Sequence, residues 1–324
     1  MPTKRGFVLG KFMPPHAGHV SLCRAAESMA DELTILVCSL PSDPIRGEQR
    51  TKWMEELFPD SRVVGMCRDV PQYPEDSEQF WPIWQAIVQE FHPEPIDLVF
   101  AGEEYGHTLA AKVGGKFIPI LREEGAESAG IAGLSGTMVR DDPAKHWRFL
   151  PFPVRRDWVK VVALHGVESV GKSTLSAQLA KRLSTIWVEE HGRAYCETHG
   201  VDLAPHDLEV IAAGQQAKID AAREWSGPTV ISDTDWLMTS AWSEMLFGQK
   251  LADQDYPLAD LYLYLPPDLP WIDDGTRFFA AHAERSRFDE ICREVLQQHD
   301  VKFVTLDAPL DARLEQAIEA ISSL

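Results

Sequence analysis

Short apolar runs alternate with helix-like patterns along the whole chain. Runs typical of buried strands occupy residues 5–10, 33–38, 62–66, 97–101, 159–165, 229–232, 260–265 and 302–306. Helical patterns cover residues 18–30, 47–57, 79–90, 172–183, 206–224 and 235–247. Because strands that alternate with helices form parallel sheets, we predict an α/β fold with a parallel sheet in each half of the chain.

The chain is expected to divide near its middle. Its 324 residues suit two domains of about 150 residues each better than a single core. Residues 149–157 carry two prolines, which disfavour a helix, and the next predicted strand begins directly after them. We therefore expect one domain over residues 1–150 and a second over residues 157–324, with a linker between them.

The composition narrows the class of protein. Hydrophobic residues make up 44% of the chain and charged residues 25%, as in ordinary globular proteins. No apolar run approaches the roughly 18–20 residues of a membrane span, so no membrane association is expected. The five cysteines are scattered without a CxxC pair, which argues against a disulfide framework or a zinc site. A reducing, cytoplasmic location fits this pattern.

The charge balance bears on partners. The formal net charge is −19, and such a surface repels the phosphate backbone of a nucleic acid. We therefore expect no nucleic-acid partner. A small nucleotide is not excluded, because a few local donors are enough to hold one triphosphate.

The loop after the first predicted strand carries two histidines. Residues 10–19 read GKFMPPHAGH, and a predicted helix follows. His19 then lies near the helix N-terminus, where free N–H groups and the helix dipole favour an anion. Gly18 leaves room for a ligand to approach, and Lys11 enters the same space from the end of the strand. This pattern predicts a phosphate-binding site.

A second segment strengthens that interpretation. Residues 134–140 read LSGTMVR, and with the first segment they resemble the two signatures of the HIGH-type nucleotidylyltransferases, which have a Rossmann-like fold. In such a family a phosphate attacks the α-phosphorus of ATP and pyrophosphate leaves. The resemblance implies that His16 and His19 contact the ATP phosphates and that Lys11 and Arg140 stabilise the developing charge. It also implies nucleotide contacts from Gly10, Phe12, Gly18, Ser135 and Thr137.

The second half opens with a P-loop. Residues 166–174, GVESVGKST, fit GxxxxGK[ST] in full and lie between a predicted strand and a predicted helix, the context that confirms this motif. Backbone N–H groups of such a loop hold phosphates, Lys172 reaches the β- and γ-phosphates, and the Ser173 hydroxyl is placed for Mg²⁺. The predicted nucleotide contacts are Gly166, Glu168, Ser169, Gly171, Ser173 and Thr174.

Two carboxylates follow a buried strand of the second half. Residues 229–235 read TVISDTD, which puts Asp233 and Asp235 at the end of that strand. A carboxylate in this place can hold a metal ion or accept the proton of an acceptor hydroxyl. Asp235 can equally cap the helix that follows.

Two further segments carry polar side chains suited to an acceptor or a lid. Residues 190–195 provide a carboxylate, an arginine and an aromatic, in Glu190, Arg193 and Tyr195. Residues 271–287 lead from Trp271 through several arginines, as the lid of a small-molecule kinase does. Of these arginines, Arg277 and Arg285 are candidate nucleotide contacts, although they could equally belong to a solvated helix face.

The order of these motifs resembles one family over essentially the whole chain. HxGH, SGTxxR, GxESxGKST, GRxY, DTD and WxDDGxR follow one another as in the NadR-type proteins, which fuse a nicotinamide mononucleotide adenylyltransferase to a ribosylnicotinamide kinase. The resemblance implies that nicotinamide riboside is phosphorylated to the mononucleotide (NMN), which is then adenylylated to NAD, with ATP and Mg²⁺. By analogy, Trp53 or another aromatic near Arg46 and Arg50 stacks on nicotinamide in the adenylyltransferase, and Trp271 does so in the kinase. The implied substrate-binding residues are Arg46, Trp53, Glu190, Arg193, Tyr195 and Trp271.

The sequence departs from the family in two places. Some members carry an N-terminal helix-turn-helix repressor module, which we expect to be absent because the first strand begins at residue 5. The usual EYGR appears as residues 190–193, EHGR, which leaves the role of position 191 open. The transferase motifs do not select the acceptor, so the same chemistries on another acceptor stay open, as does a nucleotide-sensing regulator with one inactive site. The sequence also leaves open whether the chain forms a homo-oligomer.

Overall fold

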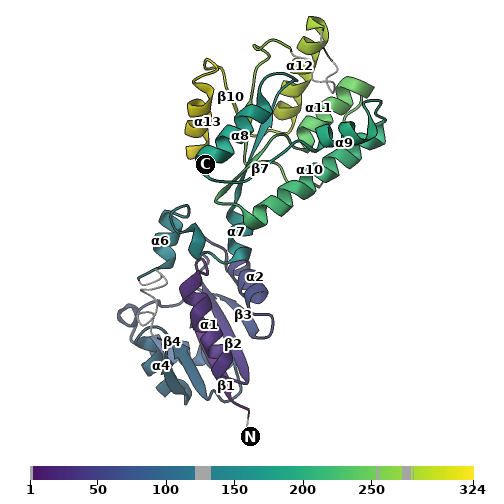
Figure 1. Cartoon of the computed structure of the whole chain (residues 1–324). Coiled ribbons are helices and arrows are strands. Elements are labelled where there is room, and N and C mark those ends of the chain that lie inside the picture. The colour runs from purple at the N-terminus through teal and green to yellow at the C-terminus, as the bar shows by residue number, and fades with distance from the viewer. Residues whose placement is uncertain (1–2, 121–132, 253–254, 272–278, 280) are drawn as a thin grey trace. The chain divides into compact units, whose positions relative to one another are not determined.

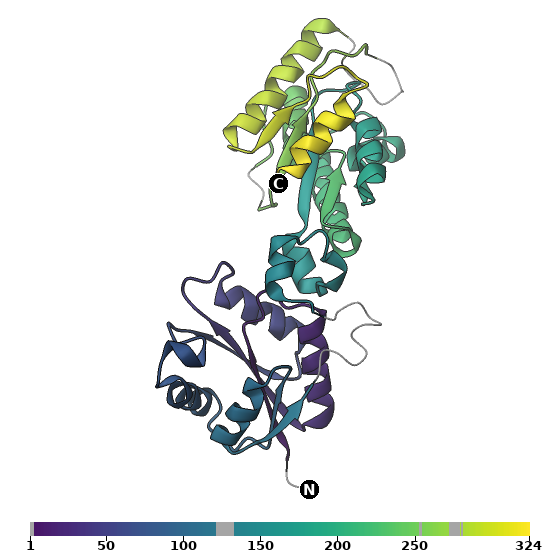
Figure 2. The same cartoon turned by 90° about the vertical axis from the view of Figure 1, so that its left-hand side faces the viewer.

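The computed structural model describes residues 3–120, 133–252, 255–271, 279 and 281–324. It divides into two compact units, Met1–Asp157 and Trp158–Leu324. The division falls at the C-terminal end of the expected linker. Each unit is α/β and is built on a parallel sheet of five strands (Figures 1 and 2).

The first unit alternates strands and helices along its length. Its elements are β1 (Arg5–Gly10), α1 (Ala17–Met29), β2 (Glu32–Ser39), α2 (Gly47–Leu57), β3 (Arg62–Cys67), η1 (Pro74–Asp76), α3 (Phe80–Phe91), β4 (Leu98–Ala101), α4 (Tyr105–Val113), β5 (Lys116–Pro119), α6 (Gly136–Asp141), η2 (Trp147–Phe149) and α7 (Phe152–Trp158). The strand order is β3-β2-β1-β4-β5, and every pairing is parallel.

The second unit repeats this plan. Its elements are β6 (Lys160–His165), α8 (Lys172–Leu183), β7 (Trp187–Val188), α9 (His191–His199), α10 (Pro205–Trp225), β8 (Thr229–Ser232), α11 (Trp236–Phe247), β9 (Leu261–Tyr264), α12 (His282–Gln298), β10 (Phe303–Thr305) and α13 (Arg313–Ser322). The strand order is β10-β9-β6-β8-β7, again parallel throughout. Helices α8 and α13 lie on one side of these strands and α10 and α11 on the other (Figure 1).

The sheets are buried on both faces, as parallel sheets are. In the first unit the side chains of Phe7 and Leu36 belong to one apolar cluster, and those of Val8 and Ile35 belong to the cluster on the opposite face. Adjacent residues of one strand point to opposite faces, so continuous apolar runs are what this arrangement requires. The prediction of two parallel-sheet α/β units is therefore confirmed.

In both sheets the first strand of the unit is central, and the chain continues to one side of it and later to the other. β1 lies between β2 and β4, and β6 lies between β9 and β8. Crevices form at the carboxyl ends of the strands at such a reversal, and ligands bind there in open α/β sheets. The fold alone thus points to the loops after β1 and β6.

The prediction for the linker is wrong in one respect. Residues 152–158 form helix α7, although two prolines were expected to prevent a helix there. Pro153 stands in the first turn, where its missing N–H has no intrahelical partner to lose. The hydrophobic pattern had also left out α4, β5, α9, α12 and α13. Within α12 the buried residues recur at helical spacing: Phe288, Ile291, Cys292, Val295 and Leu296.

Among the described residues, no helix combines the length and the apolar character that crossing a membrane requires.

Candidate sites in the two units

The first unit has a cavity of about 550 Å³ beside the loop that follows β1. It is lined from β1, α1, α3, α4 and α6. Eight residues predicted from the first motif pair are among those that line it: Gly10, Lys11, Phe12, His16, His19, Ser135, Thr137 and Arg140. The two segments, more than a hundred residues apart in the chain, therefore meet at one site.

The two histidines lie together at the start of α1. Their ring centroids are 3.9 Å apart, and His16 is buried. His16 is the N-cap of α1, and its Nδ1 accepts a hydrogen bond from the Gly18 N–H at 3.2 Å. In a neutral imidazole this leaves the proton on Nε2. With the helix N-terminus beside them, the two rings form a site suited to phosphate oxygens.

Helix α6 is hydrogen-bonded to the loop after β1. Ser135 is its N-cap and accepts from the Met138 N–H at 3.2 Å. The guanidinium of Arg140 donates both to the Met13 carbonyl and to Thr137 Oγ1. A Cβ at position 136 would lie 2.5 Å from the Met13 carbonyl oxygen, so only glycine allows this approach. The SGTxxR segment thus completes the cavity as well as lining it.

Two residues predicted to bind substrate in this unit lie elsewhere. Trp53 is buried, and its Nε1 donates to Asp157 at 2.7 Å, so its ring is part of the packing and not of the cavity wall. Arg46 is exposed at the N-terminus of α2, and it is not among the residues lining the cavity. The cavity has a different aromatic wall: Tyr73, Phe80, Trp81, Trp84 and Tyr105. Residues 80–84 had been assigned to a helix, where an apolar run cannot be told from core.

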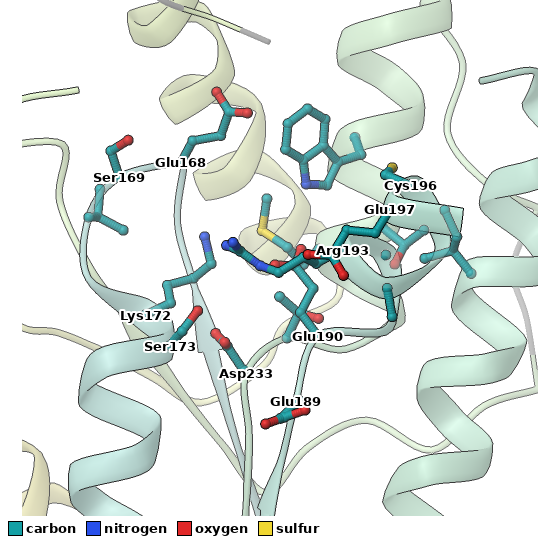
Figure 3. Close-up of a pocket in the computed structure, with 18 of the residues that line it drawn as sticks. Glu168, Ser169, Lys172, Ser173, Glu189, Glu190, Arg193, Cys196, Glu197 and Asp233 are labelled. Atoms are coloured by element: carbon teal, nitrogen blue, oxygen red, sulfur yellow. The ribbon is translucent and has the colours of Figure 1, made fainter. Parts of the chain in front are cut away.

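The second unit has a cavity of about 580 Å³ at the P-loop (Figure 3). Nine predicted residues line it: Glu168, Ser169, Gly171, Lys172, Ser173, Thr174, Glu190, Arg193 and Asp233. Gly166 lies beneath the loop, with φ of 135° and with the Leu265 carbonyl oxygen 2.5 Å from where a Cβ would stand. The Lys172 ammonium donates to the Gly166 and Val167 carbonyls at 2.8 and 2.9 Å, which holds it within its own loop.

Asp233 is the buried carboxylate of this cavity. It follows β8 and is 1% exposed, and in Figure 3 its carboxylate points into the space that Lys172 and Ser173 also face. Burial, with the negative charge of Glu190 nearby, raises the pKa of Asp233 to about 7, although Lys172 and a hydrogen bond with Ser173 act in the opposite direction. A carboxyl with such a pKa can exchange a proton near neutrality.

Asp235, predicted beside Asp233 as a catalytic residue, has another role. It is the N-cap of α11 and accepts from the N–H groups of Leu237 and Met238 at 3.1 and 3.3 Å. Its second oxygen accepts from the Tyr262 hydroxyl, and burial raises its pKa to about 6. It is not among the residues lining the cavity, so the capping alternative is the one that the structure supports.

Three other predicted residues are also absent from the described lining. The Tyr195 hydroxyl donates to Asp207 at 2.5 Å, at the start of α10. Arg285 lies behind the P-loop, where it donates to the Leu269 and Glu168 carbonyls at 2.7 and 3.3 Å. Trp271 does not line the cavity either. Arg277 lies outside the described residues.

The structure adds residues that the motifs did not reveal. Further residues lining the second cavity are Trp187, Glu189, Cys196, Glu197, Lys218 and Trp242. Position 191, left open by the sequence, has a structural role: the His191 N–H donates to Gln215 Oε1 at 2.7 Å, and its ring occupies the space that a Cβ at Gly214 would need. In the segment Ala213-Gly214-Gln215, the glycine therefore leaves space for the His191 ring and the glutamine accepts its backbone N–H.

Comparison with known proteins bears on both units. A family model described as an AAA domain matches residues 161–313, within the second unit. The protein named "Trifunctional NAD biosynthesis/regulator protein NadR" from Escherichia coli (strain K12) is 27% identical, over 98% of this chain and 83% of its own length. Its counterpart from Salmonella typhimurium (strain LT2) is 28% identical over the same shares. The chain is similar to the NadR proteins over almost its whole length.

Solved NadR structures share the fold of the whole chain. Two of them, "Crystal structure of NadR protein in complex with NR" and "Crystal structure of NadR protein in complex with NAD and AMP-PNP", each superpose with a TM-score of 0.71. Each is 23% identical in sequence and matches 99% of this chain and 96% of the NadR chain. The likeness to NadR thus covers both five-stranded units.

Proposed function

We propose that this chain is a bifunctional enzyme that makes NAD from nicotinamide riboside in two ATP-dependent steps. The second unit phosphorylates the riboside to NMN, and the first transfers the adenylyl group of ATP to NMN. The observation that carries this proposal is that each unit has its own cavity of about 550–580 Å³, lined by its own complete set of phosphate-binding groups. The identity of the acceptors, nicotinamide riboside and NMN, is inferred from the NadR relatives, which are described as NAD biosynthesis proteins.

In the first site catalysis rests on placement and charge. A phosphate oxygen of NMN attacks the α-phosphorus of ATP, the bond to the bridging oxygen breaks, and pyrophosphate leaves. The nucleophile is already anionic, so no base is required. The side chains of Lys11, His16, His19 and Arg140 belong to residues that line this cavity. We propose that they hold the two substrates and stabilise the negative charge of the transition state. The aromatic wall with Trp81 and Trp84 is suited to a planar base.

In the second site the nucleophile must lose a proton. The riboside hydroxyl attacks the γ-phosphorus of ATP, the bond to the β-phosphate oxygen breaks, and ADP leaves. Lys172 neutralises the charge on the transferring group. Asp233 accepts the hydroxyl proton, since it is a carboxylate that faces the P-loop from the end of β8. Trp187 and Trp242 are the indoles that line the cavity where the riboside would lie.

The groups around the P-loop also suit a magnesium ion. The Ser173 hydroxyl and the Asp233 carboxylate are hydrogen-bonded to each other, and both offer oxygen atoms. The described residues contain no group of three or more metal-ligating side chains, but Mg²⁺ usually takes only one or two protein ligands with phosphates and water. Bound there, the ion would neutralise charge on the β- and γ-phosphates. We propose these two residues as its ligands.

The cellular setting belongs to the same proposal. All five cysteines are free, and three of them are buried. Such thiols suit a reducing compartment, which supports a cytoplasmic enzyme.

The direct test is a pair of incubations. The protein receives ATP and Mg²⁺ with nicotinamide riboside in one tube and with NMN in the other, and the products are identified by mass. The proposal predicts NMN and NAD in the first tube and NAD with pyrophosphate in the second. Reaction with a different riboside or mononucleotide, but not with these, would keep the chemistries and change the acceptor. ATP bound without turnover in one unit would instead favour a nucleotide-sensing role.

A further inference from the structure

Three carbonyls at the end of β1 and in the loop after it each accept a hydrogen bond from a side chain of a different helix. The pairs are Leu9 with the Tyr105 hydroxyl at 3.2 Å, Lys11 with Arg50 Nη1 at 2.8 Å, and Met13 with Arg140 Nη1. The carbonyls alternate along the backbone, and their donors come from α4, α2 and α6. Each acceptor is thereby directed to a donor of the protein. A carbonyl oxygen directed at an anionic phosphate would repel it, so this arrangement keeps the loop compatible with a nucleotide.

Of the three donors, Arg50 is the one outside the cavity. Its side chain is 0% exposed, whereas Tyr105 and Arg140 line the cavity wall. Arg50 Nη2 lies 2.6 Å from Asp43 Oδ2, in an ion pair that is itself buried. Its Nη1 also donates to the Cys38 carbonyl at 3.4 Å. One guanidinium therefore joins the carboxyl ends of β1 and β2 to the loop that contains Asp43.

Stability alone is a poor explanation for the burial of the ion pair between Arg50 and Asp43. Taking two charges out of water is costly, and a buried ion pair is by itself weak evidence for stability. A guanidinium is the side chain that can reach several acceptors in one plane, whereas a lysine ammonium acts as a point charge on a flexible stem. The acceptors of Arg50 include the carbonyl of Lys11, a residue that lines the cavity.

The loop after β1 also has a backbone conformation that contacts with the rest of the unit must stabilise. Phe12, directly after Lys11, has φ of 47°, in the left-handed region that non-glycine residues avoid. Its buried ring lies under Gly10 and against His19. A loop with this conformation persists where its surroundings impose it, and the bond from Arg50 to the Lys11 carbonyl is placed one residue before the strained position.

We propose that Arg50, neutralised by Asp43, is a positioning residue for adenylyl transfer: it fixes the Lys11 main chain so that the Lys11 ammonium meets the phosphates. The inference rests on the proposed function of the first unit. It goes beyond the predicted site residues, among which Arg50 has no place. Because Arg50 acts through Lys11, its effect must depend on whether the Lys11 side chain is present.

A double-mutant cycle in the full chain tests this dependence. Arg50→Lys and Lys11→Met are made singly and together, with Arg68→Lys as the matched control, since Arg68 pairs with Glu90 on the surface. Misplacing a catalytic group by about 1 Å costs about 100-fold in rate. We expect Arg50→Lys to lower kcat for adenylyl transfer by about 10- to 100-fold and to leave riboside phosphorylation in the same molecule unchanged. In the Lys11→Met background, Arg50→Lys should cost less than about threefold.

Three results would overturn the inference. One is no loss of kcat in Arg50→Lys, and another is an equal loss with and without the Lys11 side chain, as a purely structural role predicts. The third concerns Asp43→Asn, a milder variant for use if Arg50→Lys lowers the melting temperature of the first unit. It should show the same dependence on Lys11 with a smaller loss, and an additive loss would overturn the inference. Failure of the proposed function is distinguishable: wild-type protein would then transfer no adenylyl group to NMN, and the inference would fall with it.

Discussion

The two units have the same kind of sheet, but the cavities at their sheets are lined by different kinds of groups. In the first, the groups proposed to bind phosphates are mainly side chains, and among the described residues that line the cavity Glu103 is the only carboxylate; it is exposed. In the second, a backbone loop is proposed to bind the phosphates, and a buried carboxylate, Asp233, faces that loop. This difference in the cavity lining matches the difference between the two proposed nucleophiles. A phosphate arrives ionised, whereas a hydroxyl must surrender a proton, and among the described residues only the second cavity is lined by a buried carboxylate able to take it.

The lysines of the two sites show a second contrast. Lys172 is held by the Gly166 and Val167 carbonyls, within seven residues of chain. The carbonyl of Lys11, in the loop after β1, accepts a hydrogen bond from Arg50 of helix α2. The P-loop is formed by consecutive residues, whereas the first site is formed by segments that are far apart in the chain. We therefore expect the first site to be more sensitive to substitutions away from its cavity.

The largest effect that distinguishes the units is expected from Asp233→Asn. General acid–base catalysis contributes typically 10²–10⁴ in rate. Riboside phosphorylation should therefore fall by about that factor, with ATP affinity within a few-fold, because the carboxylate acts mainly in the transition state. Adenylyl transfer by the same preparation should not change. Steady-state kinetics of both reactions, with a nucleotide-binding titration, provide the check; full kinase activity would remove Asp233 from the mechanism.

The pH dependence should separate the two reactions by a smaller factor. Asp233 has a raised pKa of about 7 and must be ionised either to accept a proton or to bind a cation. The kcat/KM for riboside phosphorylation should thus fall about tenfold per unit as the pH drops below 7. Adenylyl transfer lacks this group, and its rate should hold until the phosphate nucleophile is protonated near pH 6.

The same profile has an internal control. In Asp233→Asn the acidic limb of the kinase profile should disappear, leaving a low and flat rate. Identical profiles for the two reactions would break the contrast between the units. If extra Mg²⁺ at pH 6 restores the wild-type kinase rate, the ionised Asp233 is needed for the metal and not for the proton.

The smallest effect is expected at Asp235, two residues further on. Asparagine can still accept the N–H groups at the start of α11, and it carries no charge to bury. Asp235→Asn should change stability by less than about 2 kcal/mol and kcat by less than about threefold. Thermal unfolding and kinase assays measure both. A loss as large as that of Asp233→Asn would place Asp235 in the reaction after all.

The reliability of the sequence predictions follows the same division between local and assembled features. The P-loop was predictable because its function needs only consecutive residues after a strand, and the structure places Lys172 and Ser173 at the cavity. Asp233 and Asp235 were both predicted as catalytic residues, with capping left open for Asp235, and only the path of the chain after β8 decides that Asp235 is the cap. Trp53 was predicted to stack on nicotinamide and Trp84 was not, yet both are largely buried and only Trp84 lines the cavity.

The assembled features lay beyond the sequence patterns for a physical reason. Arg50 reads as an ordinary helical arginine, and nothing near it in the chain reveals that its partners are a carbonyl 39 residues away and a buried carboxylate. In the same way Pro153 read as a helix breaker, because its position in the first turn of α7 depends on where the helix begins. A contact between distant segments decides the case of Arg50, and the starting point of α7 decides that of Pro153.

The central claim is that two independent sites act in succession, and a mixing experiment tests it most directly. Lys172→Ala should lose riboside phosphorylation, and His19→Ala should lose adenylyl transfer, each by about 10²–10³ because one donor to a charged phosphate is removed. With ATP and riboside, Lys172→Ala alone should make little product and His19→Ala alone should accumulate NMN. An equal mixture should make NAD, because NMN released by one variant serves the other. If each variant is folded yet loses both reactions, and the mixture makes no NAD, the two motif sets form one composite site and the account is wrong.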